Sequence, residues 1–189
     1  MQRIGSGTLR GRVLRALPAG VQGVRPTGSR VREAVFDRLQ AEVRGARVLD
    51  LFAGTGALAL EALSRGAERA TLVERQARVA RHLHEQIREF SLADRVTVRQ
   101  DEALQFLRRQ PATPHDLVLL DPPYEDTATA VPLVLAALTG GGWLAPDALV
   151  VCEYDRTHGC PPDTGPAFSR EATRVYGQTG VDFLRWLGP

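Results

Sequence analysis

The sequence predicts an α/β fold with a seven-stranded, mostly parallel sheet that helices cover on both faces and an antiparallel hairpin closes. Two observations predict it. From residue 45 onward, short apolar runs of β character alternate with stretches whose apolar residues recur at helical spacing, which is typical of a parallel sheet. Near the end of the chain this alternation stops, and two β-like runs, 171–177 and 181–187, flank Gln178-Thr179-Gly180. Such a pair favours a hairpin, so one strand of the sheet is expected to run in reverse.

The elements are expected in the following order. A leader rich in Gly, Arg and Pro comes first, and its alternating residues 7–17 predict a small β-hairpin. Ser29 is a candidate N-cap for a helix with apolar residues at helical spacing up to Leu39. The strands that follow are predicted at 47–51, 70–74, 96–98, 117–120 and 149–152, and the helices between them at 57–64, 76–90, 102–109 and 128–138.

Size and composition limit the possible classes of protein. A chain of 189 residues with 43% hydrophobic and 24% charged residues is expected to form one globular unit, and we expect a monomer. No apolar run approaches the roughly 20 residues that span a bilayer, so no membrane is expected. Two cysteines give no disulfide framework, which favours the cytoplasm. Cys152, His158 and Cys160 lack a fourth ligand, so no metal site is expected.

The basic residues, all of them arginines, are unevenly distributed. Residues 1–44 carry a net charge of +6, whereas residues 45–189 carry −4. This difference divides the chain into a basic leader, 1–44, and a mildly acidic body, 45–189. A basic leader indicates a polyanionic partner, although an arginine-rich surface facing only water fits the same charges.

The strongest motif of the body is Asp121-Pro122-Pro123-Tyr124, which directly follows the apolar run 117–120. Proline cannot continue a strand ladder, so the strand is expected to end there. The Asp121 carboxylate and the Pro122 carbonyl can each accept one N–H of an exocyclic amino group, while the Tyr124 ring stacks on the base that bears it. The motif therefore predicts that Asp121, Pro122, Pro123 and Tyr124 are catalytic, although Asp-Pro also occurs in simple surface turns.

Three further strand ends carry acids, and in sheets of this kind ligands bind at the carboxyl ends of the strands. The first end, from Asp50 to Gly56, runs into a glycine loop whose loose dinucleotide fingerprint admits a nicotinamide cofactor. Asp50 argues against a pyrophosphate there and favours S-adenosylmethionine, whose ammonium and sulfonium groups are cationic. At the second end Glu74 can accept both ribose hydroxyls, and at the third Asp101 can accept the adenine amino group. The candidate cofactor contacts are Asp50, Phe52, Ala53, Gly54, Gly56, Glu74, Arg75, Asp101, Glu102 and Asp121.

The chain resembles the RsmD-like methyltransferases, which modify the 2-amino group of a guanine in bacterial small-subunit ribosomal RNA. The resemblance runs nearly end to end. Its most distinctive motif is Arg25-Pro26-Thr27-x-x-Arg30-Val31-Arg32-Glu33-Ala34-Val35-Phe36, and the cofactor loop Asp50-Leu51-Phe52-Ala53-Gly54-Thr55-Gly56 is also similar. Ala59 stands where this family more usually has Gly.

The resemblance implies a Rossmann-like class I methyltransferase fold that binds S-adenosylmethionine and methylates guanine N2 of 16S ribosomal RNA in 30S particles or their precursors. Residues 1–44 would then form the RNA-facing extension and residues 45–189 the catalytic domain. The residues expected to contact RNA are Arg3, Arg10, Arg12, Arg25, Thr27, Arg30 and Arg32. The residues alone leave two alternatives open: a DNA adenine-N6 methyltransferase with the same Asp-Pro-Pro-Tyr motif, and a nicotinamide-binding oxidoreductase or nucleotide-binding module.

Overall fold

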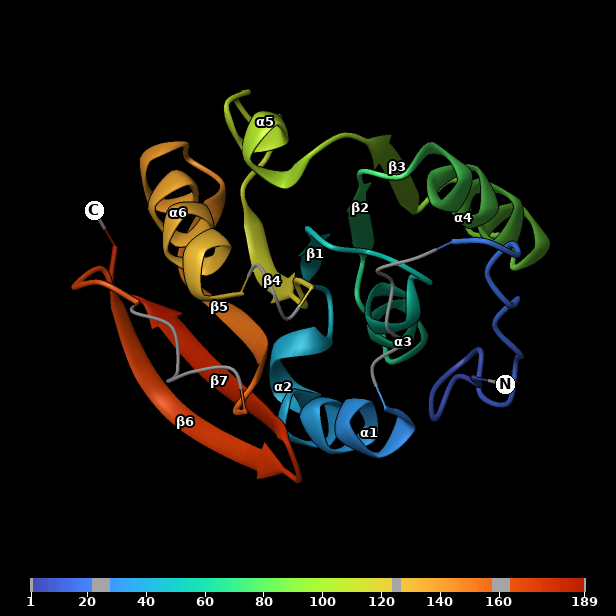
Figure 1. Cartoon of the computed structure of the whole chain (residues 1–189), viewed down its shortest axis with the longest axis horizontal. Coiled ribbons are helices and arrows are strands. Elements are labelled where there is room, and N and C mark those ends of the chain that lie inside the picture. Colours follow the sequence, from blue (N-terminus) through green and yellow to red (C-terminus); the bar gives the residue numbers. More distant parts are fainter. Residues whose placement is uncertain (1, 22–27, 124–126, 158–163, 189) are drawn as a thin grey trace.

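A seven-stranded sheet in the order β3-β2-β1-β4-β5-β7-β6 forms the centre of the protein (Figure 1). The computed structural model describes residues 2–21, 28–123, 127–157 and 164–188. The first five strands pair in parallel, β7 is antiparallel to both of its neighbours, and the predicted closing hairpin is confirmed. The strands are β1 (Arg47–Asp50), β2 (Arg69–Glu74), β3 (Val96–Gln100), β4 (His115–Leu120), β5 (Leu144–Asp155), β6 (Phe168–Tyr176) and β7 (Thr179–Trp186).

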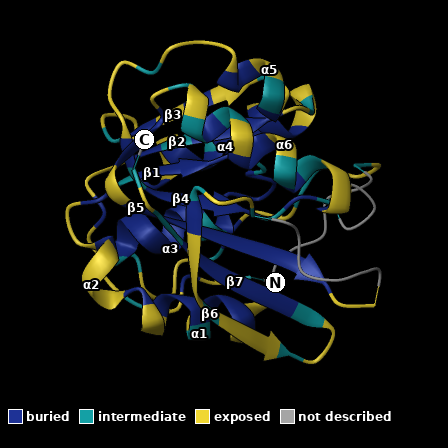
Figure 2. Cartoon of the chain, turned by 90° about the vertical axis from the view of Figure 1, so that its left-hand side faces the viewer, coloured by how far each residue is buried: buried dark blue, intermediate teal, exposed yellow. Residues whose placement is uncertain are grey.

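Helices cover both faces of the sheet and create two apolar layers. The helices are α1 (Ser29–Arg38), α2 (Gln40–Val43), α3 (Ala57–Ser64), α4 (Ala77–Glu89), α5 (Ala103–Leu107) and α6 (Thr127–Gly140). Apolar side chains of α1, α3 and α4 pack on one face of the sheet, and those of α5 and α6 pack on the other. Because both faces are covered, the central strands are buried nearly throughout, whereas β6 is exposed along much of its length (Figure 2). This explains why the centre of β1, most of β4 and the centre of β5 are apolar in sequence.

The leader packs against the body and shares its apolar core. Ile4 and Leu14 are 1% and 3% exposed, and both belong to the apolar layer that contains α1, α3 and α4. The hairpin predicted at 7–17 is shifted: one antiparallel bridge joins Arg3 to Val13, and turns occupy the residues between them. Because Ile4 and Leu14 are buried, the antiparallel pairing forms between the residues next to them, nearer to the start of the chain than predicted.

Two other local predictions were wrong. Gly28, not Ser29, occupies the N-cap position of α1, and no side chain caps that helix. Strand β5 begins at Leu144, five residues before the predicted start. Pro146 and Asp147 resemble a turn in sequence, but here they form an irregular segment inside the strand, where Asp147 has a φ of 59° and the register with β4 shifts.

Candidate active site

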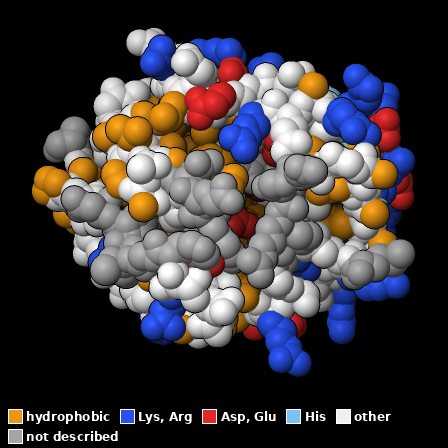
Figure 3. Space-filling view, viewed as in Figure 1, with side chains coloured by type: hydrophobic (Ala, Val, Ile, Leu, Met, Phe, Trp, Pro, Cys, Tyr) orange, Lys and Arg blue, Asp and Glu red, His pale blue; other side chains and the backbone are white. Residues whose placement is uncertain are grey.

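A cavity of roughly 750 Å³ lies at the carboxyl ends of the parallel strands. The loops after β1, β2, β3 and β4 line most of it, and the start of α1, the helix α6, the end of β5 and the start of β7 complete its wall. Acidic atoms are visible inside the hollow near the middle of the face shown in Figure 3. A cavity of this size is within the range of small-molecule sites, and its position matches the expected ligand position in such sheets.

The glycine loop between β1 and α3 forms one wall of this cavity. Phe52, Ala53 and Gly54, which were expected to contact the cofactor, line it. Gly56 is not among the lining residues but sets the path of the loop: its φ is 74°, and an added Cβ would lie 2.9 Å from Leu83 Cδ2. A side chain at this position is therefore both strained and crowded, which gives the second glycine of the motif a structural role.

Glu74, at the end of β2, connects the loops of the cavity. Its carboxylate accepts hydrogen bonds from the backbone N–H of Gly54 at 3.1 Å and of Gln76 at 2.7 Å. The side chain is 6% exposed and lines the cavity, and Arg75 and Gln76 line it beside Glu74. Because each carboxylate oxygen can accept more than one hydrogen bond, these contacts hold the carboxylate in place and leave it able to accept hydroxyl groups.

Asp101 and Glu102, after β3, also line the cavity, but they differ in their contacts. Asp101 accepts the backbone N–H of Glu102 at 2.9 Å and pairs with Arg109. Glu102 is the N-cap of α5, since its carboxylate accepts the N–H of Gln105 at 3.0 Å. The capping role in this loop therefore belongs to Glu102.

Asp50 lies below the cavity and is not one of its lining residues. It is 1% exposed, and its register partners are Leu72 on β2 and Leu119 on β4. Glu74 stands two residues further along β2, so Asp50 is roughly 6–7 Å deeper in the sheet. Neither carboxylate oxygen has a hydrogen-bond partner of ordinary geometry among the described residues, although the nearby N–H groups of Phe52 and Ala59 favour the charged form. Burial, and next the charge of Asp121, raise the pKa of Asp50 to about 7.

An Asp50→Asn variant tests this burial through stability. In the unfolded chain the carboxyl group has its ordinary pKa of 3.8, whereas in the folded protein the pKa of Asp50 is about 7. Between these values the folded state binds the extra proton, so rising pH destabilises the wild type; the effect is absent at low pH and complete above about 7. In urea titrations from pH 5 to 8.5, the variant should gain stability over the wild type and reach a plateau of roughly 2–4 kcal/mol. A difference that does not change with pH would contradict a raised pKa at Asp50.

The predicted catalytic motif follows β4. Asp121, Pro122 and Pro123 line the cavity on the side away from β2 and β3. The Pro123 carbonyl accepts the hydroxyl of Thr127 at 3.3 Å, which attaches the motif to the first turn of α6. Tyr124 lies outside the described residues. The structure thus brings Asp121 and two of its predicted partners to the same cavity as the glycine loop and Glu74.

Several cavity residues were missed from the sequence. Those that lie outside the predicted strand-end loops and the helices after them come from the start of α1, from α6 and from the last strands: Gly28, Val31, Thr129, Ala130, Leu133, Glu153 and Thr179. One of them had a signal, since Glu153 is an acid directly after the buried run 149–152, the same pattern that identified Asp121. The others lie on elements whose approach to the cavity depends on the packing of distant segments.

The arginines expected to contact RNA differ in their exposure and in their contacts. Arg3, Arg10, Arg12 and Arg30 are exposed, whereas Arg25 and Thr27 lie outside the described residues. Arg3 donates to the carbonyl of Gly11 at 3.0 Å. Arg12 donates to the carbonyl of Glu89 at 2.9 Å and stacks over Phe90 at 4.5 Å, so part of its role is structural.

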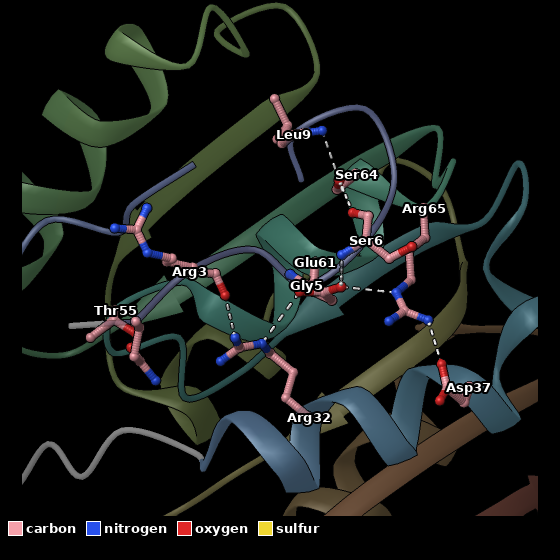
Figure 4. A network of polar contacts seen from close by, with 11 residues as sticks. Arg3, Gly5, Ser6, Leu9, Arg32, Asp37, Thr55, Glu61, Ser64 and Arg65 are labelled. Carbon is pink, nitrogen blue, oxygen red and sulfur yellow. Dashed lines mark hydrogen bonds and ion pairs between the residues drawn. The ribbon is translucent and has the colours of Figure 1, made fainter. Parts of the chain in front are cut away.

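Arg32 is 2% exposed, and the assignment of Arg32 to an RNA-contacting surface was wrong. Its Nε lies 3.4 Å from Glu61 Oε2, and its Nη2 donates to the Arg3 carbonyl at 2.6 Å (Figure 4). Glu61 is 1% exposed and also accepts the backbone N–H groups of Gly5 and Ser6 at 2.8 and 3.1 Å. The pair therefore fastens the leader to α1 and α3. The charge of a basic segment does not by itself distinguish such a buried arginine from an exposed one.

The described part of the chain gives little support to catalysis by a cysteine nucleophile or by a bound metal ion. Burial raises the pKa of the Cys152 thiol, so this cysteine stays protonated and is a poor nucleophile. Cys160 and His158 lie outside the described residues. Within the described ranges, no group of three or more acidic, histidine or cysteine residues is placed to hold a metal ion. None of the described helices is both long and apolar enough to span a membrane.

Comparisons with known proteins agree with this geometry. A family model described as "Conserved hypothetical protein 95" matches residues 2–185. The ribosomal RNA small subunit methyltransferase D of Escherichia coli K12 is 40% identical over 177 residues, which cover 93% of this chain and 85% of that protein. The protein of the same name from Haemophilus influenzae is 36% identical over 156 residues, 82% of this chain and 79% of that protein.

Solved structures show the same fold. The structure of yhhF from Escherichia coli has a TM-score of 0.87 and 36% identity, and the match covers 100% of this chain and 99% of that one. An RNA methyltransferase from Salinibacter ruber, solved with S-adenosyl-L-homocysteine, has a TM-score of 0.63 at 18% identity over 86% of this chain and 94% of that one, a likeness of fold alone. The sheet order with its reversed β7 is that of the class I methyltransferases. The chain belongs to the RsmD family, which includes the ribosomal RNA small subunit methyltransferases D and is described as "Conserved hypothetical protein 95".

Proposed function

We propose that this protein transfers a methyl group from S-adenosylmethionine to the 2-amino group of a guanine in 16S ribosomal RNA, in the cytoplasm, on 30S particles or their precursors. The observation that carries the proposal is the shared cavity: the Asp121-Pro122-Pro123 strand end faces the same space as the glycine loop and Glu74. The near-complete match to a ribosomal RNA methyltransferase at 40% identity supports the same class of substrate.

The chemistry requires orientation more than a nucleophilic side chain. S-adenosylmethionine, when bound, supplies an electrophilic methyl group. An aromatic amino nitrogen is a poor nucleophile because its lone pair is delocalised into the ring. Hydrogen bonds from its two N–H groups to the Asp121 carboxylate and the Pro122 carbonyl would favour a pyramidal nitrogen and direct the lone pair at the methyl carbon. When the amino nitrogen receives the methyl group it loses a proton, which Asp121 or a water beside it would accept.

The remaining lining residues are suited to the cofactor. Glu74 is placed to accept ribose hydroxyls, and Asp101 to accept the adenine amino group. Asp50 lies below the cavity and would interact with the cofactor through its charge. A cation bound above it stabilises the charged form of the carboxylate, so cofactor binding should lower the pKa of Asp50. This gives the buried carboxylate a function that a nicotinamide dinucleotide, with its anionic pyrophosphate, would not use.

Calorimetric titration with S-adenosylmethionine, NAD and NADP tests the cofactor assignment. Binding of S-adenosylmethionine alone is expected, and a Glu74→Gln variant should weaken it by about 10-fold, the effect of one hydrogen bond to a charged group. A protein that binds either dinucleotide and not S-adenosylmethionine would contradict the proposal.

Exposed arginines are found both on the leader and on α4. The side chains of Arg10 and Arg30 form no hydrogen bond or ion pair with other described residues, and the same holds for Arg81 and Arg88 of α4. Arginine side chains gather along the edge of the molecule that carries α4 and the leader (right in Figure 3). Since guanidinium groups bind phosphate in bidentate geometry, we assign this basic surface to the RNA backbone.

An Arg10→Ala, Arg30→Ala double variant tests that surface. Each lost phosphate contact should flatten the log–log dependence of RNA affinity on salt by roughly 0.7–0.9, and affinity at low salt should fall. Binding to 30S particles is measured by filter retention at several salt concentrations, and S-adenosylmethionine affinity, which should not change, is the control. A variant that keeps both the affinity and the slope would show that these two arginines do not contact RNA.

A further inference from the structure

Glu153 is a buried carboxylate in the wall of the cavity that the methyl-transfer chemistry does not use. It lies near the end of β5, is 7% exposed, and is one of the lining residues together with Thr179 of β7. Burying a carboxylate is costly, so one that also faces a ligand cavity is a candidate for ligand recognition.

The strand register places Glu153 beside Asp121. Leu120 of β4 is the register partner of Cys152 of β5, so continuing this register by one residue brings Asp121 opposite Glu153. Parallel partners point to the same face of a sheet, about 4.8 Å apart. That face is the one with Leu119 and Val151, since both belong to the apolar layer under α1 and α3. The cavity therefore has two neighbouring carboxylates on its substrate side, away from Glu74.

Two neighbouring carboxylates match the hydrogen-bonding edge of guanine. That edge carries a donor at N1 directly beside the 2-amino group, whereas the corresponding ring nitrogens of adenine (N1) and cytosine (N3) are acceptors. An ionised carboxylate is an acceptor only. A carboxylate next to the one that holds the amino group would thus attract guanine and repel the ring nitrogen of the other two bases.

We propose that Glu153 is a specificity-determining residue that accepts the N1–H of the target guanine while Asp121 and Pro122 hold its 2-amino group. The inference rests on the proposed function and adds to it the means by which the cavity rejects adenine and cytosine. The Asp-Pro-Pro motif alone fits all three exocyclic amino groups, so discrimination must come from a neighbouring group. Glu153 has the acceptor character that only guanine satisfies, and a site built around such a hydrogen bond rejects bases that lack the donor.

The test uses a base that keeps the amino group but lacks the N1 donor. The 30S particles are reconstituted with ligated 16S RNA that carries either guanine or 2,6-diaminopurine at the methylated position, which mass spectrometry first locates on unmodified particles. For the full-length wild-type protein, kcat/KM should favour guanine by on the order of 100-fold. Glu153→Gln places an amide opposite N1, which can donate to diaminopurine, so this ratio should fall at least 10-fold, with a gain in diaminopurine turnover. Glu153→Ala should also lower the ratio, through loss of guanine turnover.

Asp155→Asn is the matched control, because Asp155 is equally buried, on the same face of β5, but does not line the cavity. It should keep the wild-type ratio. A folded Glu153→Gln or Glu153→Ala variant with the wild-type ratio would overturn the assignment of Glu153, even if its overall rate were lower. A wild-type protein that methylates neither particle would instead overturn the proposed function, so the two failures are distinct.

Discussion

Substitution of Asp121 by Ala should lower methyl transfer by on the order of 10³-fold while S-adenosylmethionine affinity stays within about 10-fold of the wild type. The variant loses both the acceptor that orients the amino group and the nearest group that can take its proton. It also removes the negative charge that helps to raise the pKa of Asp50, so that pKa should move down toward its usual range. Single-turnover rates on 30S particles and calorimetric cofactor titration measure the two effects separately.

Two controls make this result specific. Asp121→Asn keeps the shape and one acceptor but adds a donor, so its rate should lie between those of the wild type and Asp121→Ala. Cys152→Ala tests the covalent route: the buried thiol has a raised pKa, and the variant should turn over at the wild-type rate. A folded Cys152→Ala variant without activity, or an active Asp121→Ala variant, would contradict the direct-transfer mechanism.

The largest effect on stability is expected from Arg32→Ala, which should lower the free energy of unfolding by about 3–5 kcal/mol. The substitution removes one of the two arginines that pair with the buried Glu61 carboxylate and leaves only Arg65, whose Nε lies 2.9 Å from Glu61 Oε1. It also removes the donor to the Arg3 carbonyl, so the leader should detach more readily from α1 and α3. Urea unfolding monitored by tryptophan fluorescence gives the free energy, and amide exchange at Gly5 and Ser6 reports the leader.

Arg30→Ala is the matched control on the same helix, because Arg30 is exposed; its effect should stay within about 0.5 kcal/mol. Glu61→Leu should also destabilise the protein, since it leaves Arg32 without its partner and the N–H groups of Gly5 and Ser6 without their acceptor. If Arg32→Ala matches Arg30→Ala in stability, the pair does not hold the leader in place.

Much of the fold could be predicted because local pattern and tertiary structure agree in the body. Helix α3 was predicted with its observed bounds, 57–64, and the strand ends that carry Glu74 and Asp121 were placed correctly. Each is an apolar run closed by an acid, a glycine loop or a proline, so local chemistry marks the boundary. These strand ends line much of the cavity, which explains why many of the residues expected to contact the cofactor are found there.

The predictions that failed depend on long-range packing. Arg32 is similar in sequence to its exposed neighbour Arg30, and only the position of Glu61, 29 residues away, makes it a buried ion pair. Asp50 was expected to contact the cofactor, which stays a prediction; its register partner on β2 is two residues before Glu74, and Asp50 does not line the cavity. Glu153 was missed because its place beside Asp121 follows from the pairing of β4 with β5, which local sequence does not specify. The division of the chain at residue 44 stays a prediction, although the leader and the body share one apolar layer.

The most direct test of the proposed activity is identification of the methylated nucleoside. The protein is incubated with S-adenosylmethionine labelled in its methyl group and with either unmethylated 30S particles or duplex DNA, and the products are digested to nucleosides and separated. We predict label in N2-methylguanosine from the particles, at one site, and none in the DNA. Label in N6-methyladenine from either substrate, or no label in the particles under conditions where the protein binds S-adenosylmethionine, would contradict the proposed function.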